Sequence, residues 1–208
     1  MTNKDRVNLL LPYLDSLFPD AECDLHHCKD YEFLISVMLS AQSTDKSVND
    51  VTPILFNRYD TLEKLSNAPI SDIEQIIKPI GLYKNKAKNI KSIALSIQKR
   101  GGAINDEKFL LSLPGVGNKT MNVFLAEVYS IPHLAVDTHI ERICKRLGLV
   151  KKDDNPFDME RKLEKLVESS RQIKTHHQLI RFGRSICSAK KPSCQKCKLN
   201  DFCLYYLK

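Results

Sequence analysis

Apolar residues recur at spacings of three and four along almost the whole chain, and this periodicity constrains the fold more than any other feature. The segment from Phe33 to Ala41, for example, places Phe33, Leu34, Val37 and Met38 on one helical face. Strict alternation of apolar and polar residues is missing, and so are β-branched clusters bounded by Asn-Gly or Asp-Gly turns. The sequence therefore predicts an all-α protein of about ten helices.

Capping signals indicate where individual helices begin. Ser71-x-x-Glu74 has the spacing of a capping box, and Asn155 followed by Pro156 is typical of an N-cap with proline at the first helical position. A further helix is expected from about Gln172 to Ile186. Because no long Gly/Ser linker interrupts the chain, we expect two helical lobes rather than independent domains.

Length and composition are those of a folded globular protein. The 208 residues are 42% hydrophobic and 27% charged, which is enough to bury a large core. No apolar stretch approaches the roughly 20 residues needed to cross a bilayer, and the N-terminus lacks a signal-peptide pattern. We therefore expect a protein of the cytoplasm without a membrane partner, associated with the nucleoid if its source is prokaryotic. We also expect it to be a monomer.

The C-terminal part of the sequence contains Cys187, Cys194, Cys197 and Cys203, spaced as C-x6-C-x2-C-x5-C. A reducing compartment disfavours disulfides, so four clustered cysteines indicate metal ligands. The spacing alone is compatible with zinc and with an iron–sulfur cluster. The other three cysteines, Cys23, Cys28 and Cys144, are interpreted as packing thiols.

The formal charge of +7 is unevenly distributed. Residues 1–150 hold 18 basic and 18 acidic side chains, whereas residues 151–208 hold 14 basic and 7 acidic ones. Residues 83–105 add a local run of six basic residues and no acidic one, in which Lys84, Lys88 and Lys91 share a helical face. Both features favour a polyanionic partner, although simple amphipathicity explains the lysine face equally well.

The most informative interior stretch is Leu-Pro-Gly-Val-Gly-Asn-Lys-Thr at residues 113–120, between helical runs at 107–112 and 121–129. Gly115 and Gly117 permit a tight turn with backbone angles closed to other residues, and they expose main-chain N–H groups at the start of the second helix. Val116 between them is predicted to be buried as a plug. Such a hairpin can bind a phosphate without any side chain, whereas an isolated Gly-x-Gly is usually only a helix-ending turn.

Lys119 lies in the first turn of that second helix, where the helix dipole disfavours a cation. A neutral amine there could attack an electrophilic sugar carbon, whereas an exposed ammonium could simply contact a phosphate. Asp137, in Val-Asp-Thr-His-Ile at residues 136–140, offers a carboxylate that could stabilise a cationic sugar and accept a proton. The competing interpretation is helix capping, by Asp137 or by a Thr138-x-x-Glu141 capping box.

Together these motifs resemble the endonuclease III family, the iron–sulfur branch of the helix-hairpin-helix DNA glycosylases. The resemblance spans nearly the whole chain. It includes Leu-Ser-Ala-Gln-Ser-Thr-Asp at 39–45, Ile-Gly-Leu-Tyr at 80–83, Lys-Ala-Lys-Asn-Ile at 86–90, the hairpin, Val136–Ile140 and the cysteine spacing.

The resemblance implies a two-lobed all-α fold. Residues 22–132 would form a six-helix lobe containing the helix-hairpin-helix at about 107–129. Residues 1–21 and 133–208 would form a second helical lobe, with one [4Fe-4S] cluster in the loop 187–203. It implies a base-excision-repair enzyme that removes oxidised pyrimidines from duplex DNA and then cleaves the strand at the abasic site by β-elimination.

The resemblance also implies a role for individual residues, position by position. Lys119 corresponds to the Schiff-base nucleophile, Asp137 to the catalytic carboxylate, and the four cysteines to the cluster ligands. Gln42 corresponds to the residue that fills the gap left by the extruded base, and Leu82 to the wedge in the opposite strand. Without the resemblance, a helix-end hydrogen bond for Gln42 and a core position for Leu82 would be the favoured explanations. The expected DNA contacts are Gln42, Leu82, Lys84, Gly115, Val116, Gly117, Thr120 and Lys191.

Two positions depart from the family pattern inside the hairpin. Asn118 stands where the family usually has arginine, and Met121 where it usually has alanine. We expect these changes to alter affinity rather than chemistry, because neither removes a catalytic group.

Three alternatives remain open from the sequence. A monofunctional adenine glycosylase of the same superfamily would lack Lys119 and carry a carboxylate in the early helix, yet none lies between Phe33 and Thr44. A non-enzymatic DNA-binding module could hold zinc in the same cysteines. An electron carrier would not need a phosphate-binding hairpin.

Overall fold

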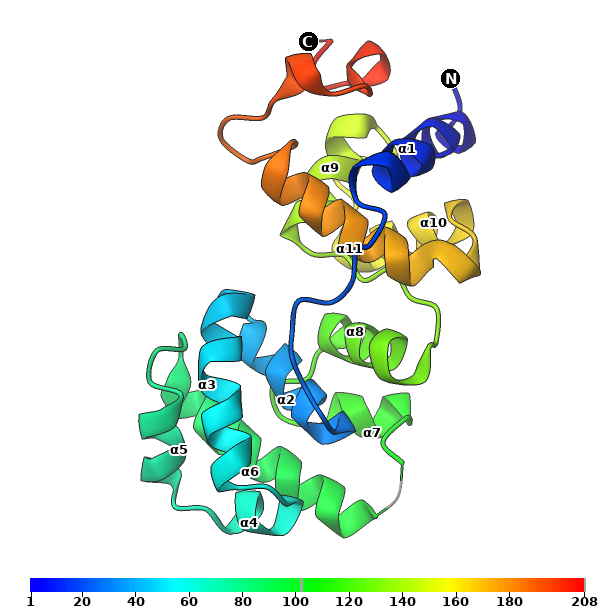
Figure 1. The fold of residues 1–208 in the computed structure, drawn as a ribbon. Coiled ribbons are helices and arrows are strands. Elements are labelled where there is room, and N and C mark those ends of the chain that lie inside the picture. The colour runs from blue at the N-terminus through cyan, green and yellow to red at the C-terminus, as the bar shows by residue number, and fades with distance from the viewer. Residues whose placement is uncertain (102, 208) are drawn as a thin grey trace. The chain divides into compact units, whose positions relative to one another are not determined.

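The computed structural model describes residues 1–101 and 103–207. Eleven α-helices and two short 3₁₀ turns make up its regular structure, and no strand occurs in these two ranges (Figure 1). The prediction of an all-α fold is therefore confirmed. No described helix is both long enough and apolar enough to cross a membrane.

The chain divides into two compact units. One consists of Asp24–Tyr129, and the other combines Met1–Cys23 with Ser130–Lys208. These boundaries differ by two or three residues from those expected from the sequence, and both descriptions join the two ends of the chain in one unit.

The Asp24–Tyr129 unit is organised around a fully enclosed helix, α2. Eight consecutive residues of α2, from Glu32 to Leu39, are buried, so this helix presents no solvent face. Helices α3, α6 and α8 pack against it. The helices of this unit are α2 (Asp30–Ser40), α3 (Asp45–Arg58), α4 (Leu62–Asn67), α5 (Ile70–Ile76), α6 (Tyr83–Arg100), α7 (Glu107–Ser112) and α8 (Asn118–Tyr129).

Side-chain caps explain the starts of α3, α4 and α7 in this unit. Thr44, Thr61 and Asp106 each accept a hydrogen bond from the backbone N–H three residues ahead. The capping box expected at Ser71 is wrong, because α5 begins at Ile70 after Pro69 and no side chain caps it. Because Pro69 has a fixed φ, the chain passes from an extended conformation into the helix there without a side-chain cap.

The second unit contains α1 (Asn3–Leu17), α9 (Thr138–Leu147), α10 (Pro156–Leu166), α11 (Ser169–Ser185) and two 3₁₀ turns, η1 (Cys194–Lys196) and η2 (Asn200–Phe202). The start predicted for α10 is confirmed, since Asn155 Oδ1 accepts from Asp158 N at 3.0 Å and Pro156 is the first helical residue. Helix α11 begins three residues before the expected Gln172.

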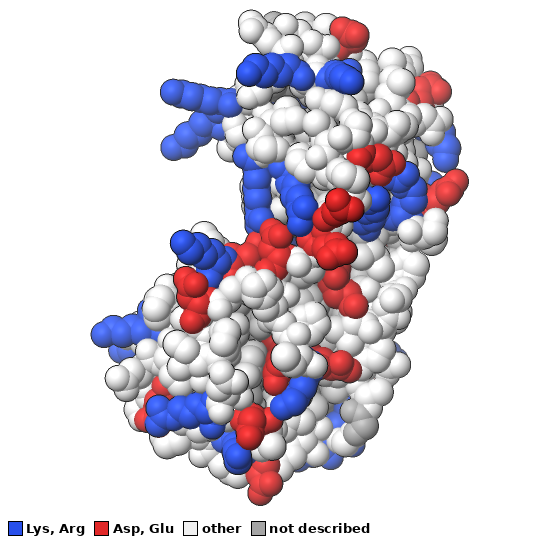
Figure 2. All heavy atoms as spheres, viewed as in Figure 1, with Lys and Arg blue, Asp and Glu red and all other residues white. Residues whose placement is uncertain are grey.

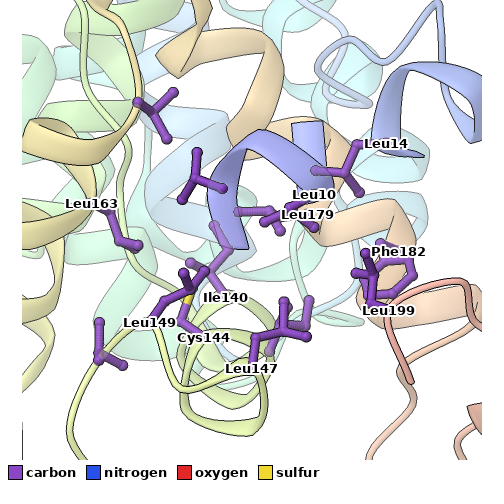
Figure 3. Close-up of a cluster of buried hydrophobic side chains, with 14 of the residues drawn as sticks. Leu10, Leu14, Ile140, Cys144, Leu147, Leu149, Leu163, Leu179, Phe182 and Leu199 are labelled. Atoms are coloured by element: carbon purple, nitrogen blue, oxygen red, sulfur yellow. The ribbon is translucent and has the colours of Figure 1, made fainter. Parts of the chain in front are cut away.

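A single apolar core joins the elements of this unit (Figure 3). Leu10 and Leu14 of α1 meet Ile140 and Cys144 of α9 in it, so the N-terminal helix is fixed to the later part of the chain. The core extends to Leu199 and Phe202 beside η2, and through them it anchors the segment that carries the cysteines.

Candidate functional site

The predicted hairpin is a type II turn between α7 and α8. Val116 N donates to Leu113 O at 3.1 Å, Pro114 occupies the second position, and Gly115 has φ 80° at the third, which type II geometry requires. Val116 is 6% exposed, so its predicted role as a buried plug is consistent with the structure. Gly117 O accepts the first bond of α8, from Met121 N at 3.0 Å.

The two hairpin glycines serve different purposes. A Cβ on Gly115 would lie 2.6 Å from Asn89 Nδ2 and 3.2 Å from Met38 Cγ, so the missing side chain lets the turn sit against α6 and α2. Gly117 has neither a positive φ nor any atom within 4 Å of a Cβ. The expectation that both glycines adopt special backbone angles is therefore right only for Gly115. The space beside Gly117 leaves the first amides of α8 open to a ligand.

Lys119 is exposed in the first turn of α8. In the described part of the chain its ammonium has no hydrogen bond or ion pair, so it is free to meet a ligand. Thr120 behind it is half-buried. Of the two departures from the family pattern, Asn118 is exposed at the first helical position, whereas Met121 is 6% exposed and belongs to the core.

Gln42 and Leu82 share an unusual backbone conformation. Their φ angles are 57° and 58°, in the left-handed region that non-glycine residues rarely adopt. Leu82 is 61% exposed, which argues against a core position, and Gln42 is exposed directly after the C-cap of α2. Strained residues of this kind concentrate at functional sites because packing elsewhere must hold them.

The lysine face of α6 is only partly free. Lys84 and Lys88 are exposed, as expected for a cationic surface. Lys91, which was expected on the same face, is half-buried and donates to the carbonyl of Ala68 at the end of α4. Lys86 is buried.

Asp137 is the N-cap of α9 in the other unit. Its Oδ1 accepts from the backbone N–H groups of His139 and Ile140, each at 2.8 Å. The capping box expected at Thr138 is wrong, because Thr138 is already the first helical residue. In the described ranges Asp137 Oδ2 makes no hydrogen bond, so the cap uses one carboxylate oxygen and leaves the other available.

All four predicted cysteine ligands line one pocket that is partly open to solvent. Arg146 of α9 braces this loop. Its guanidinium donates to Ser188 O at 2.8 Å and Ala189 O at 3.0 Å and lies 3.4 Å from Cys187 Sγ, while Cys203 Sγ lies 3.4 Å from Arg146 O. Burial raises the pKa of the Cys187 and Cys197 thiols, so a bound cation is needed to hold them as thiolates.

The four cysteines do not by themselves identify the metal. A structural zinc ion takes four thiolates with Zn–S bonds of about 2.3 Å, and an iron–sulfur cluster takes one thiolate on each of four irons. In the same unit, ligand atoms of His133, Glu160 and Glu164 lie within 4.8 Å of one another.

Basic side chains surround the cysteine loop. Lys191 is exposed between the first two cysteines, as predicted for a DNA contact, and Lys190 and Lys196 are exposed nearby. On the face shown in Figure 2, Lys and Arg gather beside the segment that Figure 1 colours orange. The loop therefore combines a candidate metal centre with a cationic surface.

Lys86 and Arg146 are two cations whose contacts the sequence did not predict. The donors of each reach backbone carbonyls 42 to 47 positions away. Lys86 lies among the apolar residues of α6, and a lysine on the buried side of a helix is a signal that could have indicated such a contact.

The fold and hairpin define a helix-hairpin-helix DNA-binding protein whose C-terminal loop carries four clustered cysteines. Residues 35–169 match the family described as HhH-GPD superfamily base excision DNA repair protein. The chain belongs to this superfamily and, within it, to the endonuclease III family.

Relatives and solved structures are similar to this chain along nearly its full length. Endonuclease III of Bacillus subtilis (strain 168) is 42% identical over 98% of this chain and 94% of the relative, and that of Escherichia coli (strain K12) is 37% identical over 98% and 97%. A trapped endonuclease III–DNA covalent intermediate superimposes with a TM-score of 0.94 at 40% identity, covering 100% of this chain and 98% of that one. A thermostable thymine-DNA glycosylase, 24% identical over 98% and 97% of the two chains, shares the fold with a TM-score of 0.85.

Proposed function

We propose that this protein is a bifunctional DNA glycosylase and abasic-site lyase of base excision repair that acts on oxidised pyrimidines in duplex DNA. The observation that carries the proposal is Lys119, an unpartnered amine at the open end of α8 in a chain that aligns over 98% of its length with enzymes named endonuclease III. A DNA substrate fits a location in the cytoplasm, at the nucleoid of a prokaryote.

The hairpin would hold the DNA backbone. The first amides of α8 have no intrahelical acceptor, the helix dipole favours an anion there, and no side chain at Gly117 blocks the approach. Lys84 and Lys191 would add sequence-independent contacts to phosphates. Such contacts fix the register of the duplex without reading its sequence.

Gln42 and Leu82 would hold the damaged nucleotide outside the duplex. C1′ is inaccessible while the base is stacked, so the nucleotide must be extruded before any amine can reach it. Both side chains are exposed on strained turns, and an apolar wedge with a polar filler can replace part of the lost stacking.

The chemistry would then proceed through an imine. The Lys119 amine, formed when the ammonium loses a proton, attacks C1′; the N-glycosidic bond breaks with its electron pair leaving on the base, which takes up a proton. The resemblance to endonuclease III gives Asp137 the role of the catalytic carboxylate. Opening of the sugar gives the Schiff base. Loss of a C2′ proton expels the 3′ phosphate by β-elimination, and water hydrolyses the imine to release Lys119.

The cysteine loop would carry one [4Fe-4S] cluster, ligated by Cys187, Cys194, Cys197 and Cys203. When bound, the cluster supplies cross-links that shape a polar loop with little apolar content of its own. Visible absorbance of the purified protein, with iron and sulfide analysis, distinguishes it from zinc. A colourless protein holding one zinc per chain would refute the cluster.

Borohydride trapping tests the enzymatic proposal. Protein is mixed with a duplex containing an oxidised pyrimidine and reduced, and a covalent protein–DNA adduct is expected. Lys119→Ala should abolish it, whereas Lys64→Ala, which removes an exposed lysine paired with Asp60, should not. Absence of an adduct with the wild-type protein, or an undiminished adduct with Lys119→Ala, would contradict the mechanism. A duplex with adenine opposite oxidised guanine tests the monofunctional alternative.

A further inference from the structure

Lys86 is a buried cation in the Asp24–Tyr129 unit. It is 5% exposed, and its ammonium donates to Leu39 O at 2.9 Å and Ala41 O at 2.6 Å and lies 3.5 Å from Ser43 Oγ. Burial lowers the pKa of Lys86, because the surroundings penalise its charged form. A charged group is retained in such a place only where its hydrogen bonds are satisfied, as they are here.

The acceptors of Lys86 lie at the C-terminal end of α2. The last carbonyls of a helix have no intrahelical donor and carry the negative end of the helix dipole. Helices often end on a glycine in the left-handed region, but the C-cap of α2 is Ala41 with φ −58° and ψ 117°. The Lys86 ammonium therefore takes the place of a glycine cap and fixes how the chain leaves α2.

The residue that follows this cap is Gln42, and Leu82 is the N-cap of α6. Lys86 contacts both turns: its side chain holds the carbonyl before Gln42, and its backbone N–H donates to Leu82 O at 3.1 Å. One residue thus connects the two strained, exposed positions.

A second contact joins the same two turns directly. Gly81 N donates to Ser43 Oγ at 3.3 Å. A Cβ on Gly81 would lie 3.2 Å from Gln42 O, so the turns are packed closely. Ser43 is also the third acceptor near Lys86, which makes the hydroxyl a bridge between the buried cation and the turn that carries Leu82.

We propose that Lys86 is a positioning residue that holds the turns of Gln42 and Leu82 in one fixed arrangement, so that both side chains enter the duplex together when a nucleotide is extruded. This inference rests on the proposed function, because it assigns Lys86 to the two residues that are proposed to replace the extruded base. Lys86 touches neither the substrate nor the reacting atoms in this scheme.

The test separates extrusion from chemistry. Single-turnover excision of an oxidised pyrimidine from a duplex requires both side chains, whereas strand cleavage at an abasic site in single-stranded DNA requires no extrusion. Lys86→Met keeps the length of the side chain and removes the charge and its hydrogen bonds. We expect duplex excision to fall by about tenfold to a hundredfold, as for a misplacement of about 1 Å outside the reacting centre, with single-strand cleavage unchanged.

Ser43→Ala provides a second variant that leaves no buried charge unpaired. It removes the bridge to Gly81, so it should shift the ratio of the two activities in the same direction by a smaller factor. Lys64→Met is the matched control for loss of a lysine in the same unit and should leave the ratio unchanged. Circular dichroism at the assay temperature establishes that each variant is folded; if Lys86→Met is not, Ser43→Ala decides the question.

The outcomes distinguish this inference from the proposed function. Equal loss of both activities, or an unchanged ratio in both variants, would overturn the role of Lys86 while the wild-type chemistry stands. Failure of the wild-type protein to excise the base or to cleave the single strand would instead overturn the proposed function.

Discussion

The two hairpin glycines offer a matched pair of substitutions with opposite consequences. Gly115 has φ 80°, and a Cβ there would meet Asn89 Nδ2 at 2.6 Å and Met38 Cγ at 3.2 Å. Gly117, two residues later, has no positive φ and no atom within 4 Å of a Cβ. Alanine at Gly115 should therefore disturb the fold, and alanine at Gly117 should disturb only what the hairpin binds.

The change in the free energy of unfolding expected for Gly115→Ala is the sum of three contributions. A left-handed conformation costs an alanine about 1–2 kcal/mol. Moving the Asn89 side chain away from the new methyl costs about 0.5–1.5 kcal/mol. The reduced entropy of the unfolded chain stabilises the variant by about 0.4–1 kcal/mol. With each contribution at the middle of its range, the net destabilisation is about 2 kcal/mol, which lowers Tm by about 4–8 °C in a chain of this size.

Thermal unfolding followed by circular dichroism measures this change, and fluorescence anisotropy with a labelled duplex measures affinity at a temperature where both variants are folded. Gly117→Ala should have the Tm of the wild type, but its DNA affinity should fall about tenfold or more, as for loss of a hydrogen bond to a charged group. Equal destabilisation by both substitutions, or normal affinity in Gly117→Ala, would refute the distinction between a packing glycine and a ligand-facing one.

Three further predictions concern charge and thiols. Hydrogen bonds from Arg171 lower the pKa of Asp15, so the stability that this carboxylate provides is present above the ordinary carboxyl pKa of about 3.9 and is lost as the pH falls below it; urea midpoints of Asp15→Asn should accordingly change less between pH 6 and pH 3 than those of the wild type. Burial raises the pKa of Cys144 to about 12, so mass spectrometry after brief alkylation should find exposed Cys28 modified and Cys144 intact unless the protein unfolds. Lys84→Ala should make the slope of log K against log salt shallower by about 0.9, and an unchanged slope would exclude a phosphate contact there.

Much of the fold could be predicted because its signals are local. Apolar spacing identified the helices, and Asn155 with Pro156 gave the start of α10 to the residue. The prediction failed at Ser71 and Thr138, where the correct cap spacing occurs inside a helix that had already begun. A capping box identifies a possible start, but the neighbouring Pro69 and Asp137 decided which start the chain uses.

The supports of the candidate site could not be predicted in the same way. Lys86 reads as one more cation of a basic helix, yet its role follows from carbonyls that lie 45 and 47 positions earlier in the chain. Likewise, sequence spacing does not reveal that Gly115 faces Asn89 and Met38 whereas Gly117 faces open space. Long-range contacts of this kind are set by packing, which periodicity does not encode.

The geometry of Asp137 makes helix capping compatible with its proposed catalytic role. Oδ1 accepts from the amides of His139 and Ile140 at 2.8 Å each, while Oδ2 has no hydrogen bond in the described ranges. The cap therefore fixes the orientation of the carboxylate and leaves one oxygen for a proton or a cationic sugar. Asparagine is also a good N-cap, so Asp137→Asn should retain both stability and DNA binding while turnover falls strongly. Asp137→Ala should lose the turnover and, in addition, about 1 kcal/mol of stability. If Asp137→Asn turned over DNA normally, or if it lost binding together with stability, the carboxylate would be a cap and nothing more.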